Sequence, residues 1–418
     1  MSNVVPEGWK RDKLSNICHI VGGGTPDRSE RQYWNGTIPW ISPTEVTKLK
    51  SRYISNSKEM ITNLGLEKSS AKLHPIGTVL MTSRASIGYV AINNIPVTTN
   101  QGFQSLQCKQ DIYNEYLYQH ITWIRPELEK LSAGSTFSEI SSTTLKSVNL
   151  TFPPLPEQKK IAAILTSVDE VIEKTQAQID KLKDLKTAMM QELLTCGVGV
   201  DGKPHTEFKD SPVGRIPKGW EVKVLEELVK LDRKITYGIV QAGPHYEGGV
   251  PYIRVSDMNN RELSANGMLL TSPEIAKKYD RSSVQTGDIV YALRGMIGHV
   301  HIVPESLNGA NLTQGTARLS INDEINTNYL LWAMRSPYVA LQNDLEAKGS
   351  TFKEVTLASL RKISVAIPSI TEQEDISLIL SAIERKQYFV EDKIIQLKSL
   401  KKALMQDLLT GKVRVKVD

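Results

Sequence analysis

The sequence contains little cysteine and no long hydrophobic run. Its three cysteines, Cys18, Cys108 and Cys196, lie far apart and form no CxxC pair. Such a sparse, odd set argues against a disulfide framework and is typical of proteins in a reducing compartment. No apolar stretch approaches the roughly 20 residues that a membrane-spanning helix needs, and residues 1–11 lack the apolar core of a secretory signal. We therefore expect a cytoplasmic protein that makes no membrane contact.

The sequence also lacks recognisable catalytic motifs. The glycine run at 22–24 is not followed by the Lys-Ser or Lys-Thr pair of a phosphate-binding loop, so we interpret it as a tight turn. Asp27 is not followed at close spacing by the Asp/Glu-x-Lys pattern of metal-dependent nucleases. Ser83 lies in a Thr-Ser-Arg-Ala-Ser segment and not in the Gly-x-Ser-x-Gly elbow of hydrolases. No methyl-donor motif is found. We therefore expect no catalytic residue and no metal site.

The sequence does contain an internal repeat: one module of about 215 residues occurs twice in tandem. Matching motifs recur in the same order, and the offset stays between 210 residues (77 to 287) and 215 residues (134 to 349). A repeat this long does not form a solenoid and predicts two similar lobes that face two similar targets. The matched segments are 6–9 (PEGW) with 217–220 (PKGW), 38–41 (IPWI) with 250–253 (VPYI), 77–80 (GTVL) with 287–290 (GDIV), 101–102 with 314–315 (QG), 134–137 with 349–352 (GSTF), 157–158 with 372–373 (EQ), and 191–195 (QELLT) with 406–410 (QDLLT).

Each module begins with short β-type runs and ends in one long helix. Glycine, proline, asparagine and serine separate the runs, as strand-and-turn structure requires. Expected strands lie at 78–81, 89–92, 288–293 and 299–303, and expected short helices at 115–124 and 328–335. We predict an α+β fold: lobe one at 1–155, a helix at 156–197, a linker at 198–216, lobe two at 217–370, a helix at 371–411 and a tail at 412–418.

The two long helices carry start and stop signals. Pro156 suits the first turn of one helix, and Thr371 with Glu374 predicts a capping box at the start of the other. Gly197 and Gly411 stand where a helix end needs a left-handed residue. About 39 residues lie between these signals, which corresponds to roughly 58 Å of helix.

Apolar residues recur along both helices at alternating steps of four and three, the period of a coiled-coil seam. Thr175 and Gln387 interrupt this seam in one helix each, whereas Lys186 and Lys401 occupy the same seam position in both. A helix of roughly 58 Å exceeds the width of a domain of about 150 residues. We therefore expect an antiparallel coiled coil with a lobe at each end. The predicted seam residues are Ile161, Leu165, Val168, Ile172, Ile179, Leu182, Met189, Ile376, Leu380, Ile383, Val390, Ile394, Leu397 and Leu404.

The order of lobe, helix, lobe and helix resembles the specificity (S) subunits of type I restriction-modification enzymes. The local motifs do so as well, and they cover essentially the whole chain: 23–26 (GGTP), 33–34 (YW), 38–40 (IPW), 99–103 (TNQGF), 134–136 (GST) and 153–158 (PPLPEQ). Lobe two departs from the pattern, with KITYG at 234–238 in place of GGTP.

The resemblance implies that each lobe is a target recognition domain and each helix a conserved spacer. It implies a prokaryotic, non-catalytic subunit that binds double-stranded DNA at a bipartite, asymmetric target. The implied protein partners are two methyltransferase (modification) subunits and, through the complex, restriction subunits. The assembled complex would be an ATP-dependent endonuclease and adenine-N6 DNA methyltransferase. It uses S-adenosylmethionine, ATP and magnesium, none of them bound by this subunit. A coiled-coil scaffold with two protein-binding lobes is the alternative.

Comparison of the two lobes suggests where DNA contacts lie. Arg84 and Arg294 occupy the same place in each repeat and fit a phosphate or guanine contact, or else a local ion pair. Polar and aromatic stretches that differ between the lobes are candidates for base reading, and we call them divergent stretches. They are 28–34 and 42–48 in lobe one, and 233–237, 245–246 and 254–260 in lobe two. We expect partner subunits on the outward helix faces, which include Lys181, Lys183, Lys398 and Lys402. The candidate DNA-contacting residues are Thr25, Arg28, Arg31, Tyr33, Trp34, Trp40, Thr44, Lys48, Arg84, Arg233, Lys234, Tyr237, His245, Tyr246, Arg254, Asn259 and Arg294.

Overall fold

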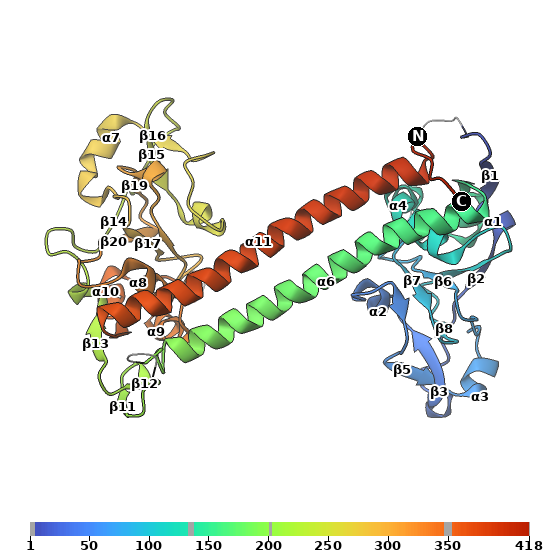
Figure 1. Cartoon of the computed structure of the whole chain (residues 1–418), viewed down its shortest axis with the longest axis horizontal. Coiled ribbons are helices and arrows are strands. Elements are labelled where there is room, and N and C mark those ends of the chain that lie inside the picture. Colours follow the sequence, from blue (N-terminus) through green and yellow to red (C-terminus); the bar gives the residue numbers. More distant parts are fainter. Residues whose placement is uncertain (1–4, 133–137, 200–202, 347–352, 418) are drawn as a thin grey trace. The chain divides into compact units, whose positions relative to one another are not determined.

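The computed structural model describes residues 5–132, 138–199, 203–346 and 353–417. It divides into two compact units, Met1–Ile179 with Val390–Asp418 (unit one) and Asp180–Phe389 (unit two). Both divisions fall inside long helices, α6 (Leu155–Leu193) and α11 (Ile370–Leu409). Each unit therefore combines one lobe with the start of that lobe's own helix and the end of the other module's helix (Figure 1).

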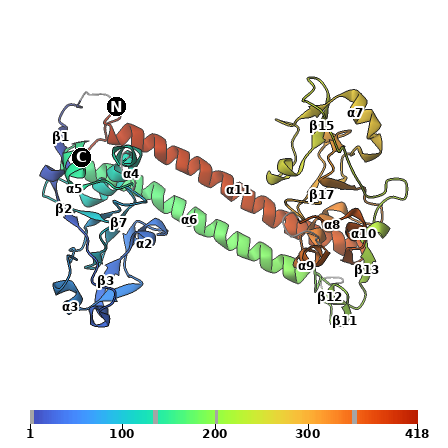
Figure 2. The same cartoon turned by 180° about the vertical axis from the view of Figure 1, so that it is seen from behind.

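Unit one contains a five-stranded sheet in the order β2-β9-β6-β7-β4 and a three-stranded sheet in the order β5-β3-β8, while β1 pairs with β10. The apolar run of β6 lies at the centre of the larger sheet and is fully buried. Figure 2 shows the same elements from behind. The strands are β1 (Lys10–Lys13), β2 (Cys18–Gly22), β3 (Trp34–Ile41), β4 (Tyr53–Ile54), β5 (Glu59–Ile61), β6 (Val79–Met81), β7 (Val90–Asn93), β8 (Thr98–Thr99), β9 (Gln104–Cys108) and β10 (Asn149–Phe152). The short helices are α1 (Leu14–Ile17), η1 (Arg31–Tyr33), α2 (Pro43–Thr47), α3 (Asn63–Glu67), α4 (Asn114–Leu131) and α5 (Ser142–Ser147).

Unit two contains a four-stranded sheet in the order β14-β20-β17-β18 and a three-stranded sheet in the order β16-β15-β19. Two further antiparallel pairs, β11 with β12 and β13 with β21, complete its strands. The strands are β11 (Phe208–Ser211), β12 (Gly214–Pro217), β13 (Glu221–Val224), β14 (Thr236–Tyr237), β15 (Val250–Ile253), β16 (Leu270–Thr271), β17 (Ile289–Ala292), β18 (Val300–Ile302), β19 (Asn311–Leu312), β20 (Thr316–Leu319) and β21 (Ser364–Ile367). The short helices are η2 (Leu225–Glu227), η3 (Val255–Asn259), α7 (Pro273–Lys278), η4 (Asp280–Ser282), η5 (Glu305–Leu307), α8 (Thr327–Met334), α9 (Pro337–Glu346) and α10 (Leu357–Arg361).

The two lobes pair their equivalent strands in the same way. β3 runs parallel to β8 in lobe one, as β15 does to β19 in lobe two. β6 lies antiparallel to β7 and β9, as β17 does to β18 and β20. The predicted duplication and the α+β class are therefore confirmed, and the expected strands and short helices coincide with observed elements. The repeated motif at 134–137 and 349–352 lies outside the described residues.

The ends of the long helices match their sequence signals at three of four places. Gly197 and Gly411 adopt φ values of +73° and +70°, the left-handed conformation expected after a helix end. Pro156 lies in the first turn of α6. The capping box at Thr371 does not form, because α11 begins one residue earlier and the hydroxyl of Ser369 accepts the backbone N–H of Glu372 at 3.4 Å.

Within each unit, the start of one long helix lies antiparallel to the end of the other. Lys401 on α11 pairs with Asp169 on α6 at 2.6 Å in unit one. Lys186 on α6 pairs with Glu384 on α11 at 3.4 Å in unit two. These ion pairs explain why both helices carry a lysine at the same seam position, since each lysine meets an acid of the opposite helix. The predicted seam residues are all buried or half-buried.

The repeated PxGW and Glu-Gln motifs meet at the ends of the long helices. Trp220 is buried against Gly197 and donates its indole N–H to Glu372 at 2.9 Å. In unit one, Trp9 packs on Gly411 in the equivalent place. Each unit thus ties the first turn of its own helix to the last turn of the other module's helix, which accounts for the recurrence of both motifs.

Candidate nucleic-acid interface

In lobe one, a hollow of about 520 Å³ lies beside β3 and β5. Three cations and one acid line it, so its net charge favours an anionic ligand. A second hollow of about 420 Å³ contains the predicted Thr44 and Lys48 and shares Lys58 with the first. The lining of the first hollow is Arg28, Arg31, Trp34, Asn35, Lys58, Glu59 and Met60.

We call Arg28, Arg31, Lys48, Lys50 and Lys58 the lobe-one basic surface. The three predicted members come from the divergent stretches at 28–34 and 42–48, and the structure brings them together around the two hollows. Sequence reasoning missed Lys50 and Lys58. A signal was available, because both follow the predicted Lys48 closely in the sequence, Lys50 before β4 and Lys58 after it.

Arg28 is the most constrained cation of this surface. Its terminal nitrogens pair with both carboxylate oxygens of Glu59, with Nη2 to Oε2 at 3.1 Å. Its guanidinium carbon lies 4.1 Å from the ring centroid of Trp34 and 4.9 Å from that of Trp40. The hydrogen bond to Glu59 raises the pKa of Arg28, and the same bond lowers the pKa of Glu59.

Other predicted residues of lobe one are engaged in the fold. Trp40 is 2% exposed and donates its indole N–H to the carbonyl of Gly24. The prediction that Trp40 contacts DNA is therefore wrong, because its ring is buried. Arg84 pairs with Glu139 at 2.8 Å across a strand bridge, which is the local ion pair that the sequence left open. Thr25 donates a hydrogen bond to Gln101, and Tyr33 is half-buried.

Two of the predicted arginines in lobe two serve the fold. Arg233 donates to the carboxylate of Asp288 at 2.8 Å and to the hydroxyl of Ser320 at 3.0 Å, and its side chain is largely buried. Contrary to the prediction, Arg233 is therefore not available to contact DNA. Arg254 donates its Nε and Nη2 protons to Asp257, a bond that raises the pKa of Arg254.

The other predicted residues of lobe two lie on several elements. Lys234 is exposed just before β14, and Tyr237 is exposed within it. His245 and Tyr246 are exposed beside β16, where the His245 ring accepts a hydrogen bond from the backbone N–H of Leu270 at 3.1 Å. Asn259 is exposed at the end of η3, and Arg294 is half-buried.

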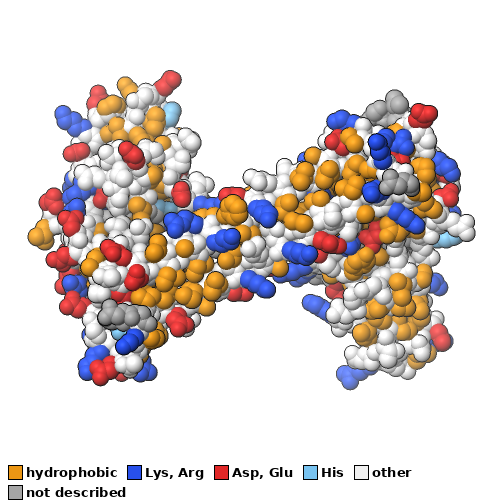
Figure 3. Space-filling model, viewed as in Figure 1, with side chains coloured by type: hydrophobic (Ala, Val, Ile, Leu, Met, Phe, Trp, Pro, Cys, Tyr) orange, Lys and Arg blue, Asp and Glu red, His pale blue; other side chains and the backbone are white. Residues whose placement is uncertain are grey.

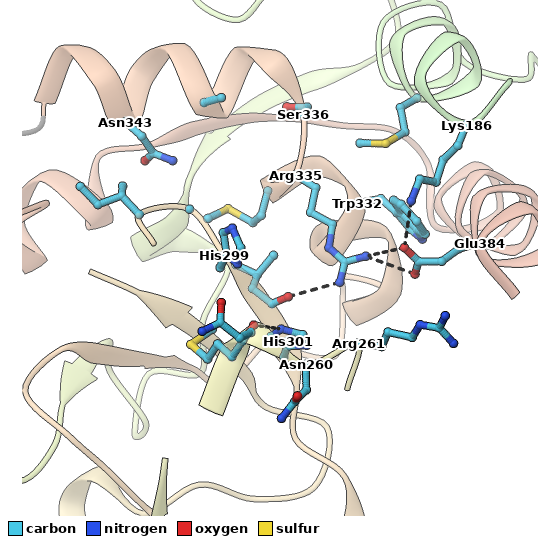
Figure 4. A pocket seen from close by; sticks show the side chains of 18 of the residues that line it. Lys186, Asn260, Arg261, His299, His301, Trp332, Arg335, Ser336, Asn343 and Glu384 are labelled. Carbon is cyan, nitrogen blue, oxygen red and sulfur yellow. Dashed lines mark hydrogen bonds and ion pairs between the residues drawn. The ribbon is translucent and has the colours of Figure 1, made fainter. Parts of the chain in front are cut away.

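Unit two also contains a groove of about 640 Å³, lined by the two long helices, α8, α9 and the β18 region (Figure 4). Glu384 at its edge receives Arg335 at 3.3 Å and Lys186 at 3.4 Å. The ring of His301 bonds the carbonyl of Met258 at 3.0 Å, and burial lowers the pKa of His301. In the part of the chain that the structure describes, no group of three or more His, Cys, Asp or Glu residues could hold a metal ion.

The strand pairing that the two lobes share defines a duplicated α+β protein, with a basic surface on lobe one. The chain belongs to the type I restriction modification DNA specificity domain family, whose model matches residues 6–184 and 217–399. Specificity subunits are non-catalytic, and the catalytic activities belong to the other subunits of the complex.

The relatives span most of the chain. It is 28% identical to the type I restriction enzyme MjaIX specificity subunit of Methanocaldococcus jannaschii, over 98% of this chain and 95% of that protein. It is 29% identical to the type I restriction enzyme EcoBI specificity subunit of Escherichia coli, over 67% of this chain and 61% of that protein. The fold resembles the crystal structure of a type I S subunit from M. genitalium, with a TM-score of 0.60 and 16% identity over 98% of this chain and 97% of that one. Among the described residues, no helix is long and apolar enough to cross a membrane.

Proposed function

We propose that this specificity subunit recognises a bipartite, asymmetric sequence in double-stranded DNA, with one half-site read by each lobe. The observation that carries the proposal is the combination of shared strand pairing with divergent surfaces. Lobe one carries a basic surface with Arg28 beside Trp34, whereas lobe two exposes Lys234, Tyr237 and Tyr246. Two lobes with the same strand pairing but different exposed side chains fit two half-sites of different sequence.

The second part of the proposal concerns partners. Two methyltransferase (modification) subunits dock on the outward faces of α6 and α11, and restriction subunits join through them. Lys181, Lys183, Lys398 and Lys402 are exposed on these helices. Figure 3 shows lysine and arginine side chains among apolar ones on the face of the long helices that is in view. Because each module supplies one long helix, the two faces offer two similar docking places. S-adenosylmethionine, ATP and magnesium are used on the other subunits.

Methylation mapping tests the proposal. The chain is expressed with a modification subunit in a host that lacks other methylation, and the genome is sequenced for modified bases. The expected result is one sequence made of two short defined halves that flank a gap of fixed length. A modified sequence without two halves would contradict the bipartite model.

DNA affinity separates the proposal from a protein-binding scaffold. A reader that neutralises several phosphates loses affinity steeply as salt rises, because counterions released from DNA drive binding. We expect the logarithm of the association constant to fall linearly with the logarithm of salt concentration. A scaffold whose lobes bind proteins would show weak affinity without this dependence.

A further inference from the structure

A base-reading arginine must be held in place and must still have donors to offer. Arg28 is held on two sides, by the carboxylate of Glu59 and by the ring of Trp34. Its side chain is nevertheless 55% exposed, on the rim of the lobe-one hollow. Trp40, buried beneath, meets Trp34 edge-to-face at a centroid distance of 5.2 Å and so keeps the stacked ring in position.

The donors that remain on Arg28 form a pair. A guanidinium has five N–H groups in a fixed fork. Glu59 takes one from each terminal nitrogen. Three N–H groups remain, and two of them, on Nε and Nη2, point in parallel along the free edge of the fork. Parallel N–H groups on arginine match the O6 and N7 acceptors of guanine in the major groove.

Three other candidate arginines, Arg254, Arg233 and Arg84, do not combine these properties. Arg254 spends the same Nε and Nη2 edge on Asp257. Arg233 bonds Asp288, Ser320 and a backbone carbonyl. Arg84 is drawn to Glu139 through its Nε. Among these four arginines, only Arg28 is fixed by a carboxylate through both terminal nitrogens while its parallel Nε–H and Nη2–H donors remain unused.

We propose that Arg28 is the residue with which lobe one reads a guanine, and that Glu59 is the positioning residue that aims it. The assignment rests on the proposed function. Glu59 and the indole ring fix the guanidinium before DNA arrives, so less side-chain entropy is lost on binding. Arg31 and Lys58, in the same hollow, face the phosphates on either side of that base and act as point charges.

Methylation mapping of the full chain, expressed with a modification subunit, tests the assignment through two matched variants. Arg28→Lys keeps the charge but cannot form the paired contact, whereas Arg11→Lys makes the same change at an exposed arginine of β1, outside the lobe-one basic surface. We expect Arg28→Lys to lower the preference for guanine at one position of one half-site by about 5- to 150-fold. Arg11→Lys should leave the recognised sequence unchanged. Retention of the other half-site in the same map shows that Arg28→Lys is folded.

A double-mutant cycle tests the role of Glu59. Glu59→Gln should weaken the preference at the same guanine and nowhere else. Because Glu59 acts through Arg28, the Arg28→Lys, Glu59→Gln double variant should lose no more preference than Arg28→Lys alone. An additive loss, or a loss at other positions, would overturn the positioning role.

The outcomes separate this assignment from the proposed function. If the unmodified chain directs no bipartite methylation, the proposed function fails and the assignment with it. If it does so, but neither half-site contains a guanine that depends on Arg28, the assignment alone is wrong. Uniform weakening of both half-sites by Arg28→Lys would also overturn it, because that pattern identifies a phosphate contact.

Discussion

At the scale of single residues, Glu372 connects three segments of unit two. Its carboxylate accepts the backbone N–H groups of Val198 and Gly199, the indole N–H of Trp220 and a bond from His205. The side chain is 5% exposed, so water cannot replace these donors. Removal of one partner from buried, charge-assisted hydrogen bonds is strongly destabilising.

We therefore predict that Glu372→Gln lowers the free energy of unfolding of the chain by on the order of 2 kcal/mol. The matched control is Glu157→Gln, at the same repeat position in unit one. Glu157 pairs with Arg414, whose side chain is 45% exposed and screened by water, so its loss should cost less. Urea unfolding of the two variants measures the difference, and equal losses would contradict the prediction.

Two buried histidines predict acid sensitivity in unit one. Burial lowers the pKa of His74 to about 4 and that of His120 to about 4. In the unfolded chain both histidines take up protons near pH 6.5, whereas in the folded chain both imidazole rings stay neutral down to about pH 4. The contribution of these histidines to the free energy of unfolding is therefore unchanged above about pH 6.5. As the pH falls from about 6.5 toward 4, the free energy of unfolding decreases by roughly 3 kcal/mol for each histidine.

Urea midpoints at pH 7.5, 6.0 and 5.0 measure this loss. His74→Gln should reduce the slope of stability against pH in that range, because glutamine does not titrate. His19→Gln, at an exposed position, serves as the control. A slope that is the same in all three chains would show that His74 is not responsible.

At the scale of elements, the ion pairs of the helix seam predict a charge-exchange result. Lys401 and Asp169 are each 15% exposed, so neither charge is well solvated. Lys401→Asp should destabilise unit one by placing two carboxylates together. Exchange of both residues, Lys401→Asp with Asp169→Lys, should recover most of the loss. Unfolding measurements on the single and double variants form the cycle, and additive effects would mean that the pair does not interact.

The elements also show what the sequence could predict. Helix ends, seam positions and most strands follow local patterns, and the structure places them within a few residues of the expected ranges. The environment of a polar side chain depends on residues far along the chain. Arg233 meets Asp288 and Trp40 meets the Gly24 carbonyl only after the strands have paired, so the residues next to each of them in the sequence did not show that the fold would use these side chains. Glu59 was missed for the same reason.

At the scale of the whole molecule, the central question is what sets the gap between half-sites. α6 is one helix of 39 residues that begins in unit one and ends in unit two, and α11 is one helix of 40 residues that runs between the same units in reverse. Insertion of one heptad into each helix, after Gln178 and after Phe389, keeps the seam in phase, because seven residues restore the 3.5-residue period. It lengthens each helix by about 10.5 Å, which is close to three base pairs.

We predict that a chain with both insertions recognises the same two half-site sequences, separated by about three more base pairs. Insertion into one helix alone shifts one side of the seam against the other and should instead destabilise the chain, so it serves as the control. Methylation mapping with the modification subunit reads the gap directly. A folded double-insertion chain that still methylates the original sequence with the original gap would rule out the helices as the ruler. Separation of the lobes would then have to be set by the DNA or by the partner subunits.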